Sequence, residues 1–250
     1  LITELTASGE IDGKIGKTTI IHTQGKIPAK RVVVVGLGKR EDFDFEEVRK
    51  ASAAALKSAK EVKAKKIATI VHGAGIGGLN TKEASKALVE GSIIGDYKYE
   101  EFVTKREEPE IKIEELIIVE REKEKIKDIE DGARLGEVIA SAVNRVRDLV
   151  NGPSNKVTPT FLADYAKETG IECEILGLSD IKRIGMEAIA SVAKGSKEEP
   201  KVVILKWKGE GKEKETIGLI GKGITFDAGG ISLKNPKKLA EMKMDMAGAA

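Results

Sequence analysis

Apolar positions recur with two different periods in the first 120 residues, and the two periods alternate along the chain. Short apolar runs predict strands over residues 18–22, 31–35, 67–71 and 111–119. Between them, apolar residues spaced three to four apart predict helices over residues 46–63 and 81–91. Strands that alternate with helices indicate an α/β fold for this part of the chain.

A single long helix is predicted next. From Glu124 to Val150, apolar residues follow a helical period over about seven turns. Gly152 and Pro153 end this pattern, because neither residue continues a helix well. A helix of this length between two α/β regions indicates a connector. We therefore predict an N-terminal α/β domain at 1–122, a connecting helix at 123–150 and a second domain at 151–250.

The second domain continues the alternation of helices and strands. We expect a helix that begins near Pro159 and a short helix near Asp180. Apolar runs predict strands over residues 172–176, 188–192, 202–207 and 217–220. The α/β class therefore extends over both halves of the chain.

Composition and charge narrow the functional classes. The 43 Lys and Arg residues nearly balance the 41 Asp and Glu residues, and both signs are interspersed. A nearly balanced charge produces no strong positive electrostatic potential that would attract nucleic acid or an anionic membrane, so we expect neither as a partner. Cys173 is the only cysteine, which excludes an internal disulfide and fits a reducing compartment. Because the sequence shows no signal peptide and its apolar runs are too short to span a bilayer, we expect a cytoplasmic protein.

The segment 221–250 carries the most distinctive chemistry. Asp245 falls inside a helical apolar stripe that also contains Met242, Met246 and Ala249. An ionised carboxylate in such a stripe is costly unless it is paired or bound to a metal. Lys222 follows a predicted buried strand, so it lies where open α/β sheets usually bind their ligands. Asp227 comes five residues later.

Two stretches of this region carry a family resemblance. Residues 221–234 (GKGITFDAGGISLK) and 241–250 (EMKMDMAGAA) resemble the metal-site signature of the leucyl aminopeptidases. Residues 147–159 (RDLVNGPSNKVTP) resemble the Asn-x-Pro-x-x-x-x-Thr-Pro segment that opens the catalytic domain of the same family. Ala228 stands where relatives often carry serine, at a position that is not a ligand.

The resemblance implies a fold, an activity and a site. It implies that the second domain begins an α/β metallopeptidase catalytic domain with a mixed sheet. Peptides with a free N-terminus would lose their first residue through a hydroxide activated by two divalent metal ions, Mn or Zn, with Mg or Co as alternatives. Lys222, Asp227 and Asp245 would bind metal, and Lys234 would act as the catalytic lysine that stabilises the oxyanion. The full-length protein would be a homo-hexamer.

The family draws further metal-binding carboxylates and an arginine from an Asn-Thr-Asp-Ala-Glu-Gly-Arg motif. This motif does not occur in the chain, which begins at Leu1 without a methionine and stops at Ala250. We therefore expect the chain to lack its natural N-terminus, to carry only the first part of the catalytic domain, and to be inactive by itself.

Three other interpretations stay open. Gly73, Gly75 and Gly78 form a G-x-G-x-x-G pattern after a predicted strand, with Asp96 about twenty residues on, as in nucleotide-binding oxidoreductases. Against this interpretation, Thr81 has the features of a helix N-cap beyond the glycines. The N-terminal domain could alternatively be a non-catalytic assembly module. Finally, the charged residues of 221–250 could form ordinary ion pairs, Lys222 with Asp227 and Lys243 with Asp245.

Overall fold

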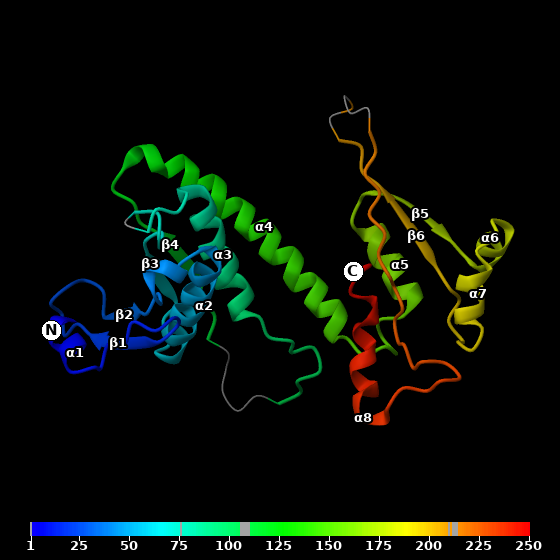
Figure 1. Ribbon diagram of the computed structural model, residues 1–250, viewed down its shortest axis with the longest axis horizontal. Helices are drawn as coiled ribbons and strands as arrows, with labels where there is room; N and C mark the ends of the chain where they lie inside the picture. The colour runs from blue at the N-terminus through cyan, green and yellow to red at the C-terminus, as the bar shows by residue number, and fades with distance from the viewer. Residues whose placement is uncertain (1, 76, 106–110, 210, 212–214) are drawn as a thin grey trace. The chain divides into compact units, whose positions relative to one another are not determined.

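The computed structural model describes residues 2–75, 77–105, 111–209, 211 and 215–250. It divides the chain into two compact units, Leu1–Arg145 and Val146–Ala250 (Figure 1). The division falls inside the long helix α4 (Ile126–Asn151). Each unit has its own sheet or sheets and its own core, and each is described by itself.

The first unit contains two small sheets. Strands β1 (Thr18–His22) and β2 (Arg31–Val35) pair antiparallel, with Thr18 opposite Val35. Strands β3 (Lys66–Thr69) and β4 (Glu115–Ile118) pair parallel, with Lys66 opposite Glu115. Helix α1 (Ile2–Ala7) and the short 3-10 helices η1 (Arg40–Asp42) and η2 (Lys123–Lys125) lie in the connections.

Helices α2 (Phe45–Glu61) and α3 (Thr81–Asp96) supply most of the core of this unit. Helix α2 begins where the side chain of Asp44 accepts hydrogen bonds from the backbone N–H groups of Glu46 and Glu47, which satisfies donors that no helical carbonyl reaches. An ion pair joins the two helices, with Arg49 Nε 2.6 Å from the buried carboxylate of Glu90. The buried apolar residues between them are Val48, Ala87, Leu88 and Val89.

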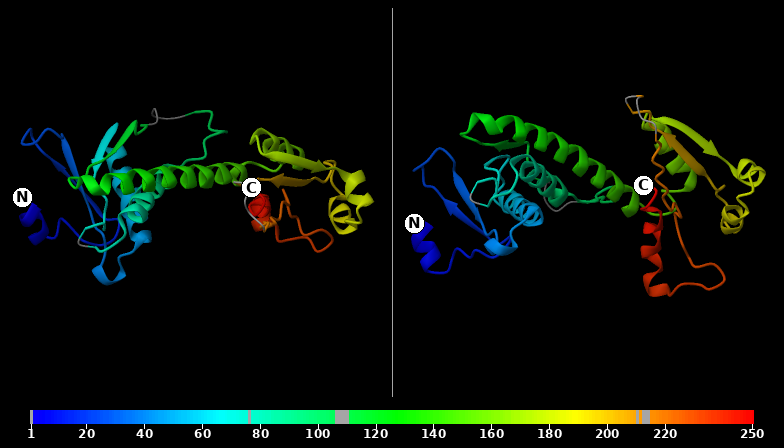
Figure 2. Two further views of the ribbon diagram at one scale, coloured as in Figure 1. Left: turned by 90° about the horizontal axis from the view of Figure 1, so that it is seen from above. Right: turned by 45° about the horizontal axis from the view of Figure 1, so that its top comes forward.

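Helix α4 packs closely along α3 within this unit (Figure 1, Figure 2). The contact depends on Gly132, because a Cβ atom there would lie 2.1 Å from the backbone oxygen of Lys82. Asn144 strengthens the packing further along α4 by donating a hydrogen bond from Nδ2 to the carbonyl of Ile93, at 3.3 Å.

Replacing Gly132 with alanine should therefore destabilise the first unit. Alanine favours a helix over glycine by about 1 kcal/mol, but a Cβ atom at 2.1 Å from a backbone oxygen forces the two helices apart. Such overpacking costs typically about 1–3 kcal/mol, so we expect a net loss. Urea denaturation followed by circular dichroism would measure it, with Glu130→Ala at an exposed position of α4 as the control. Unchanged stability of Gly132→Ala would contradict the close contact.

The second unit surrounds the end of α4. Helix α5 (Pro159–Glu168) begins at Thr158, whose hydroxyl accepts a hydrogen bond from Phe161 N at 3.1 Å. Strands β5 (Glu172–Leu176) and β6 (Val202–Lys206) pair antiparallel, and helices α6 (Leu178–Arg183) and α7 (Glu187–Ala193) lie between them in sequence. Helix α8 (Pro236–Leu239) runs directly into the 3-10 helix η3 (Ala240–Met246). The buried residues Leu149, Val157 and Met246 form the core beside η3.

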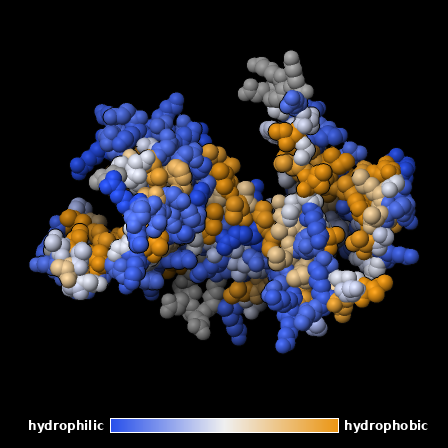
Figure 3. All heavy atoms as spheres, viewed as in Figure 1, coloured by the Kyte–Doolittle hydropathy of each residue, from blue (hydrophilic) through white to orange (hydrophobic). Residues whose placement is uncertain are grey.

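The α/β class expected from the sequence is confirmed, and two predicted strands are wrong. Residues 188–192 lie in the helix α7, because this short alanine-rich run has no neighbouring strand to pair with and can close helical hydrogen bonds instead. Residues 217–220 belong to no helix or strand in the described part of the chain. The side chains of Ile217, Leu219 and Ile220 are 86%, 93% and 102% exposed, so no layer covers them here. Figure 3 shows apolar residues gathered on the face of the second unit that is drawn over β6.

No helix among the described residues combines the length and the apolarity that crossing a bilayer requires.

Candidate metal centre

The four site residues predicted from the sequence lie together in the second unit. Lys222 Nζ is 2.6 Å from Asp245 Oδ2 and 3.8 Å from Asp227 Oδ2. Lys234 Nζ is 2.8 Å from the same oxygen, Asp227 Oδ2. Two ammonium groups and two carboxylates therefore alternate across the cluster, and no side chain faces only groups of its own charge.

A glycine loop brings Lys234 back to Asp227. The carboxylate of Asp227 accepts a hydrogen bond from Gly229 N at 2.9 Å, and Lys234 N donates to Ala228 O at 2.9 Å. Gly229 has φ of +92°, and a Cβ atom there would lie 2.4 Å from the backbone oxygen of Ser232. Only glycine fits this turn. The chain then enters α8, whose N-cap Asn235 accepts from Lys237 N at 3.0 Å.

Asp245 is presented by η3 rather than by the α-helix expected from the sequence. Side chains at positions i and i+3 of a 3-10 helix eclipse one another. Met242 and Asp245 consequently share one face of η3, and Met242 Sδ lies 3.2 Å from Lys234 Nζ. Lys243 and Met246 share a second face, and Met246 is fully buried there. Asp245 thus lies on a polar face beside Met242 and not in an apolar stripe with Met246.

The charges of the cluster shift the pKa values of two groups. The ammonium of Lys234, with help from Gly229 N–H, holds the pKa of Asp227 below its ordinary value. The carboxylate of Asp245 raises the pKa of Lys222 above its ordinary value. In the absence of metal, Asp227 is therefore a carboxylate and Lys222 an ammonium at neutral pH.

The alternative interpretation expected two ordinary ion pairs, Lys222 with Asp227 and Lys243 with Asp245. The first pair is present, and the second is wrong. Lys243 does not pair with Asp245; its Nζ donates instead to the backbone oxygen of Asn151, at 2.6 Å. Lys222 takes the place beside Asp245. The sequence alone did not indicate the contacts of Lys243 and Met242, although both residues stand inside the EMKMDM motif.

The cluster fits a divalent metal, but only as part of a coordination shell. Asp245 Oδ2 is buried and, apart from the contact with Lys222, receives no hydrogen bond from the described residues. Lys222 is thus the cationic partner of this buried oxygen, and a divalent metal at Asp245 would take the place of the lysine's proton. Asp227 and Asp245 offer the hard oxygen ligands that Mn, Mg and Zn accept. However, no group of three or more His, Cys, Asp or Glu side chains in the described ranges is arranged to hold a metal ion.

The glycine pattern at 73–78 has structural reasons that need no nucleotide. A Cβ atom at Gly73 would lie 2.6 Å from the ring of Phe43 and 2.8 Å from Leu79 Cδ1, so this glycine permits close packing. Helix α3 begins after the glycines, and its N-cap is Asn80 rather than the predicted Thr81: the side chain of Asn80 accepts a hydrogen bond from Glu83 N at 3.1 Å.

The acidic residue of the proposed nucleotide fingerprint is also engaged elsewhere. Asp96 Oδ1 lies 2.6 Å from Lys60 Nζ, in an ion pair that joins α3 to α2. A ribose-binding carboxylate should face the glycine turn instead. These contacts favour a structural role for both Asp96 and the glycine loop.

Comparisons with known proteins agree with the motifs. Residues 144–250 match the catalytic domain of the cytosol aminopeptidase family, and residues 1–106 match the N-terminal domain of the same family. A probable cytosol aminopeptidase of Alkaliphilus oremlandii (strain OhILAs) is 37% identical over 254 residues, which cover 100% of this chain and 51% of the relative. That of Aquifex aeolicus (strain VF5) is 37% identical over 241 residues, covering 95% of this chain and 47% of the relative.

A solved structure shares the fold. The bottromycin maturation enzyme BotP in complex with Mn superposes with a TM-score of 0.83 at 27% identity, covering 98% of this chain and 50% of that protein. The chain spans about half the length of the curated relatives it matches. Since both domain matches name one family and relatives align along the whole chain, the chain belongs to the cytosol aminopeptidase family.

Proposed function

We propose that this chain contributes the N-terminal domain and the first part of the catalytic domain of a metal-dependent aminopeptidase that releases N-terminal residues from peptides. The proposal rests on one observation: Asp227 and Asp245 both form ion pairs with Lys222, in the region that matches the family's catalytic domain. The proposed enzyme acts in the cytoplasm, as the names of the relatives suggest, and assembles as a homo-hexamer.

Lys222, Asp227 and Asp245 would hold metal, with Mn or Zn as the expected ions. The Mn-bound structural relative supports a divalent metal. Asp227 is already a carboxylate in the metal-free site, as a ligand must be. Lys222 has to lose a proton before its nitrogen can donate a lone pair, and the Asp245 contact opposes that loss. Metal binding should therefore release a proton from Lys222.

Lys234 has a different proposed role, because it pairs with Asp227 whereas Lys222 lies closest to Asp245. Two bound ions would supply activation of water and polarisation of the scissile carbonyl. The side-chain nitrogen of Lys234 is oriented by its contacts with Asp227 Oδ2 and Met242 Sδ. It would donate a hydrogen bond to the negative oxygen that develops on the substrate carbonyl. The free amine at the peptide N-terminus would provide the recognition that limits cleavage to the first residue.

Two carboxylates and one amine provide too few ligands for a pair of ions, which together need about eight or more. The missing ligands would come from the part of the enzyme that corresponds to the other half of its relatives. The proposed activity therefore belongs to the full-length protein.

Removal of metal from the full-length protein tests this proposal. Chelation should lower hydrolysis of leucine-anilide by about a hundredfold or more, because a bound metal contributes several kcal/mol to the transition state. Activity should return when Mn or Zn is added back, and an N-acetylated substrate should stay uncleaved. Full activity in the chelated protein, or cleavage of the acetylated substrate, would refute a metal-dependent aminopeptidase.

A further inference from the structure

The 3-10 helix η3 is held to the rest of the second unit by contacts on two of its faces. On one face, Met246 is fully buried with Leu149 and Val157. On the same face, three residues earlier, Lys243 Nζ donates to Asn151 O at 2.6 Å. The other face carries Asp245 and Met242 toward Lys222 and Lys234.

The partner of Lys243 is the last residue of α4. The carbonyl groups in the last turn of a helix have no helical donors, and the helix dipole makes this end attractive to a cation. Lys243 is half-buried, and within the described ranges its ammonium makes no ion pair. The lysine therefore works as a C-terminal cap that fastens η3 to the end of α4.

This attachment bears on Asp245 because η3 is short. A 3-10 helix has weaker internal hydrogen bonds than an α-helix, so its rotation about its own axis depends on tertiary contacts. Leu239, the residue before η3, has no side-chain group that could cap the helix, and η3 continues directly from α8. Lys243 and Met246 anchor one face of η3, and Asp227 N donates to Met242 O at 3.3 Å on the other; together these contacts set the rotation that places Asp245 beside Lys222.

We propose that Lys243 is a positioning residue for the metal centre: by capping α4 it sets the rotation of η3 and so aims the carboxylate of Asp245. The inference rests on the proposed metal-binding function. Partners that orient a ligand typically change metal affinity by about 10–100-fold when they are removed. Lys243 belongs to this class although it contacts neither Asp227 nor Lys222.

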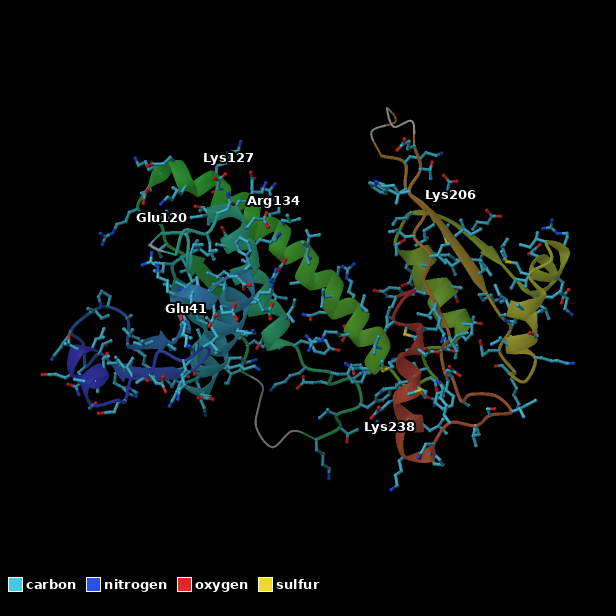
Figure 4. The ribbon with its side chains drawn as sticks, viewed as in Figure 1. Glu41, Glu120, Lys127, Arg134, Lys206 and Lys238 are labelled. Carbon is cyan, nitrogen blue, oxygen red and sulfur yellow. The ribbon has the colours of Figure 1, made fainter. Side chains whose placement is uncertain are left out.

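The test measures the Mn affinity of the full-length protein by calorimetry, together with the thermal unfolding of its metal-free form. Lys243→Met keeps the aliphatic stem and removes the donor, so we expect about tenfold weaker Mn binding or more. Lys243→Arg retains a cationic donor and should recover most of the lost affinity. Lys238→Met is the matched control, since Lys238 is an exposed lysine of α8 (Figure 4) and should bind Mn as the unaltered protein does.

The outcomes separate the two claims. Wild-type Mn affinity in Lys243→Met, even with a lower melting temperature, would reduce Lys243 to a stabilising contact and overturn the inference alone. An equal loss in Lys243→Arg and Lys243→Met would also contradict it. If Lys243→Met does not fold, the shorter Lys243→Gln replaces it, with the same weakened binding expected and unchanged affinity as the contrary result. Absence of Mn binding in the unaltered protein would refute the proposed function and this inference with it.

Discussion

Replacing Lys234 with alanine in the full-length enzyme should lower kcat by about a hundredfold or more while the metal content stays the same. Lys234 contacts Asp227 Oδ2 through its ammonium, but it lies outside the group of residues that would donate to metal. Its loss would remove a hydrogen-bond donor from the developing oxyanion, which is a contribution made in the transition state and hardly in the ground state. KM should therefore change much less than kcat.

Steady-state kinetics with leucine-anilide and metal analysis of the same preparations measure both quantities. Lys237→Ala is the control, because this exposed lysine lies three residues further on and its backbone contact with Asn235 survives the change. An unaltered kcat in Lys234→Ala would remove Lys234 from the mechanism. A fall in metal content would instead assign the lysine to the orientation of Asp227.

A polypeptide that consists only of Leu1–Ala250 should hydrolyse leucine-anilide at less than about a hundredth of the full-length rate, even with Mn or Zn in excess. The physical reason is the incomplete ligand set, in which Asp227 and Asp245 are the carboxylates that the described residues supply. Loss of a single oxyanion donor already costs about that factor, and here several groups would be missing. The exposed side chains of residues 217–220 should also make this polypeptide associate.

The comparison requires both polypeptides under one set of conditions, with size-exclusion chromatography to record their association. Asp245→Asn in the shorter polypeptide serves as the background control, since any turnover that survives this change does not come from the site. Metal-dependent turnover by Leu1–Ala250 above about a hundredth of the full-length rate would mean that this half holds a complete site.

Local pattern predicted the strands that find a pairing partner in the structure. The strands at 18–22 and 31–35 were predicted with the bounds that β1 and β2 have, because each has an apolar run and the two form a hairpin. Residues 188–192 and 217–220 failed because an apolar run becomes a strand only when a neighbour completes its hydrogen bonds. The sequence contains no local sign of whether that neighbour is present.

For the site, the sequence predicted which residues lie together but not how each of them is paired. The motifs indicated that Lys222, Asp227, Lys234 and Asp245 belong together, and the structure brings all four together. Sequence spacing suggested Lys243 as the partner of Asp245, since the two residues are close along the chain. That pairing was wrong because side chains two residues apart do not face each other in a helix, and Lys243 reaches the end of α4 instead.

The alternation of ammonium and carboxylate groups bears on how the protein would acquire its metal. Clustered carboxylates normally repel one another until a cation arrives, so that many small metal sites fold only when metal is present. Here Lys222 and Lys234 already neutralise Asp227 and Asp245. Folding of this region would then be independent of the metal supply in the cell, and loading would be an exchange in which the entering ion replaces a proton on a preformed site.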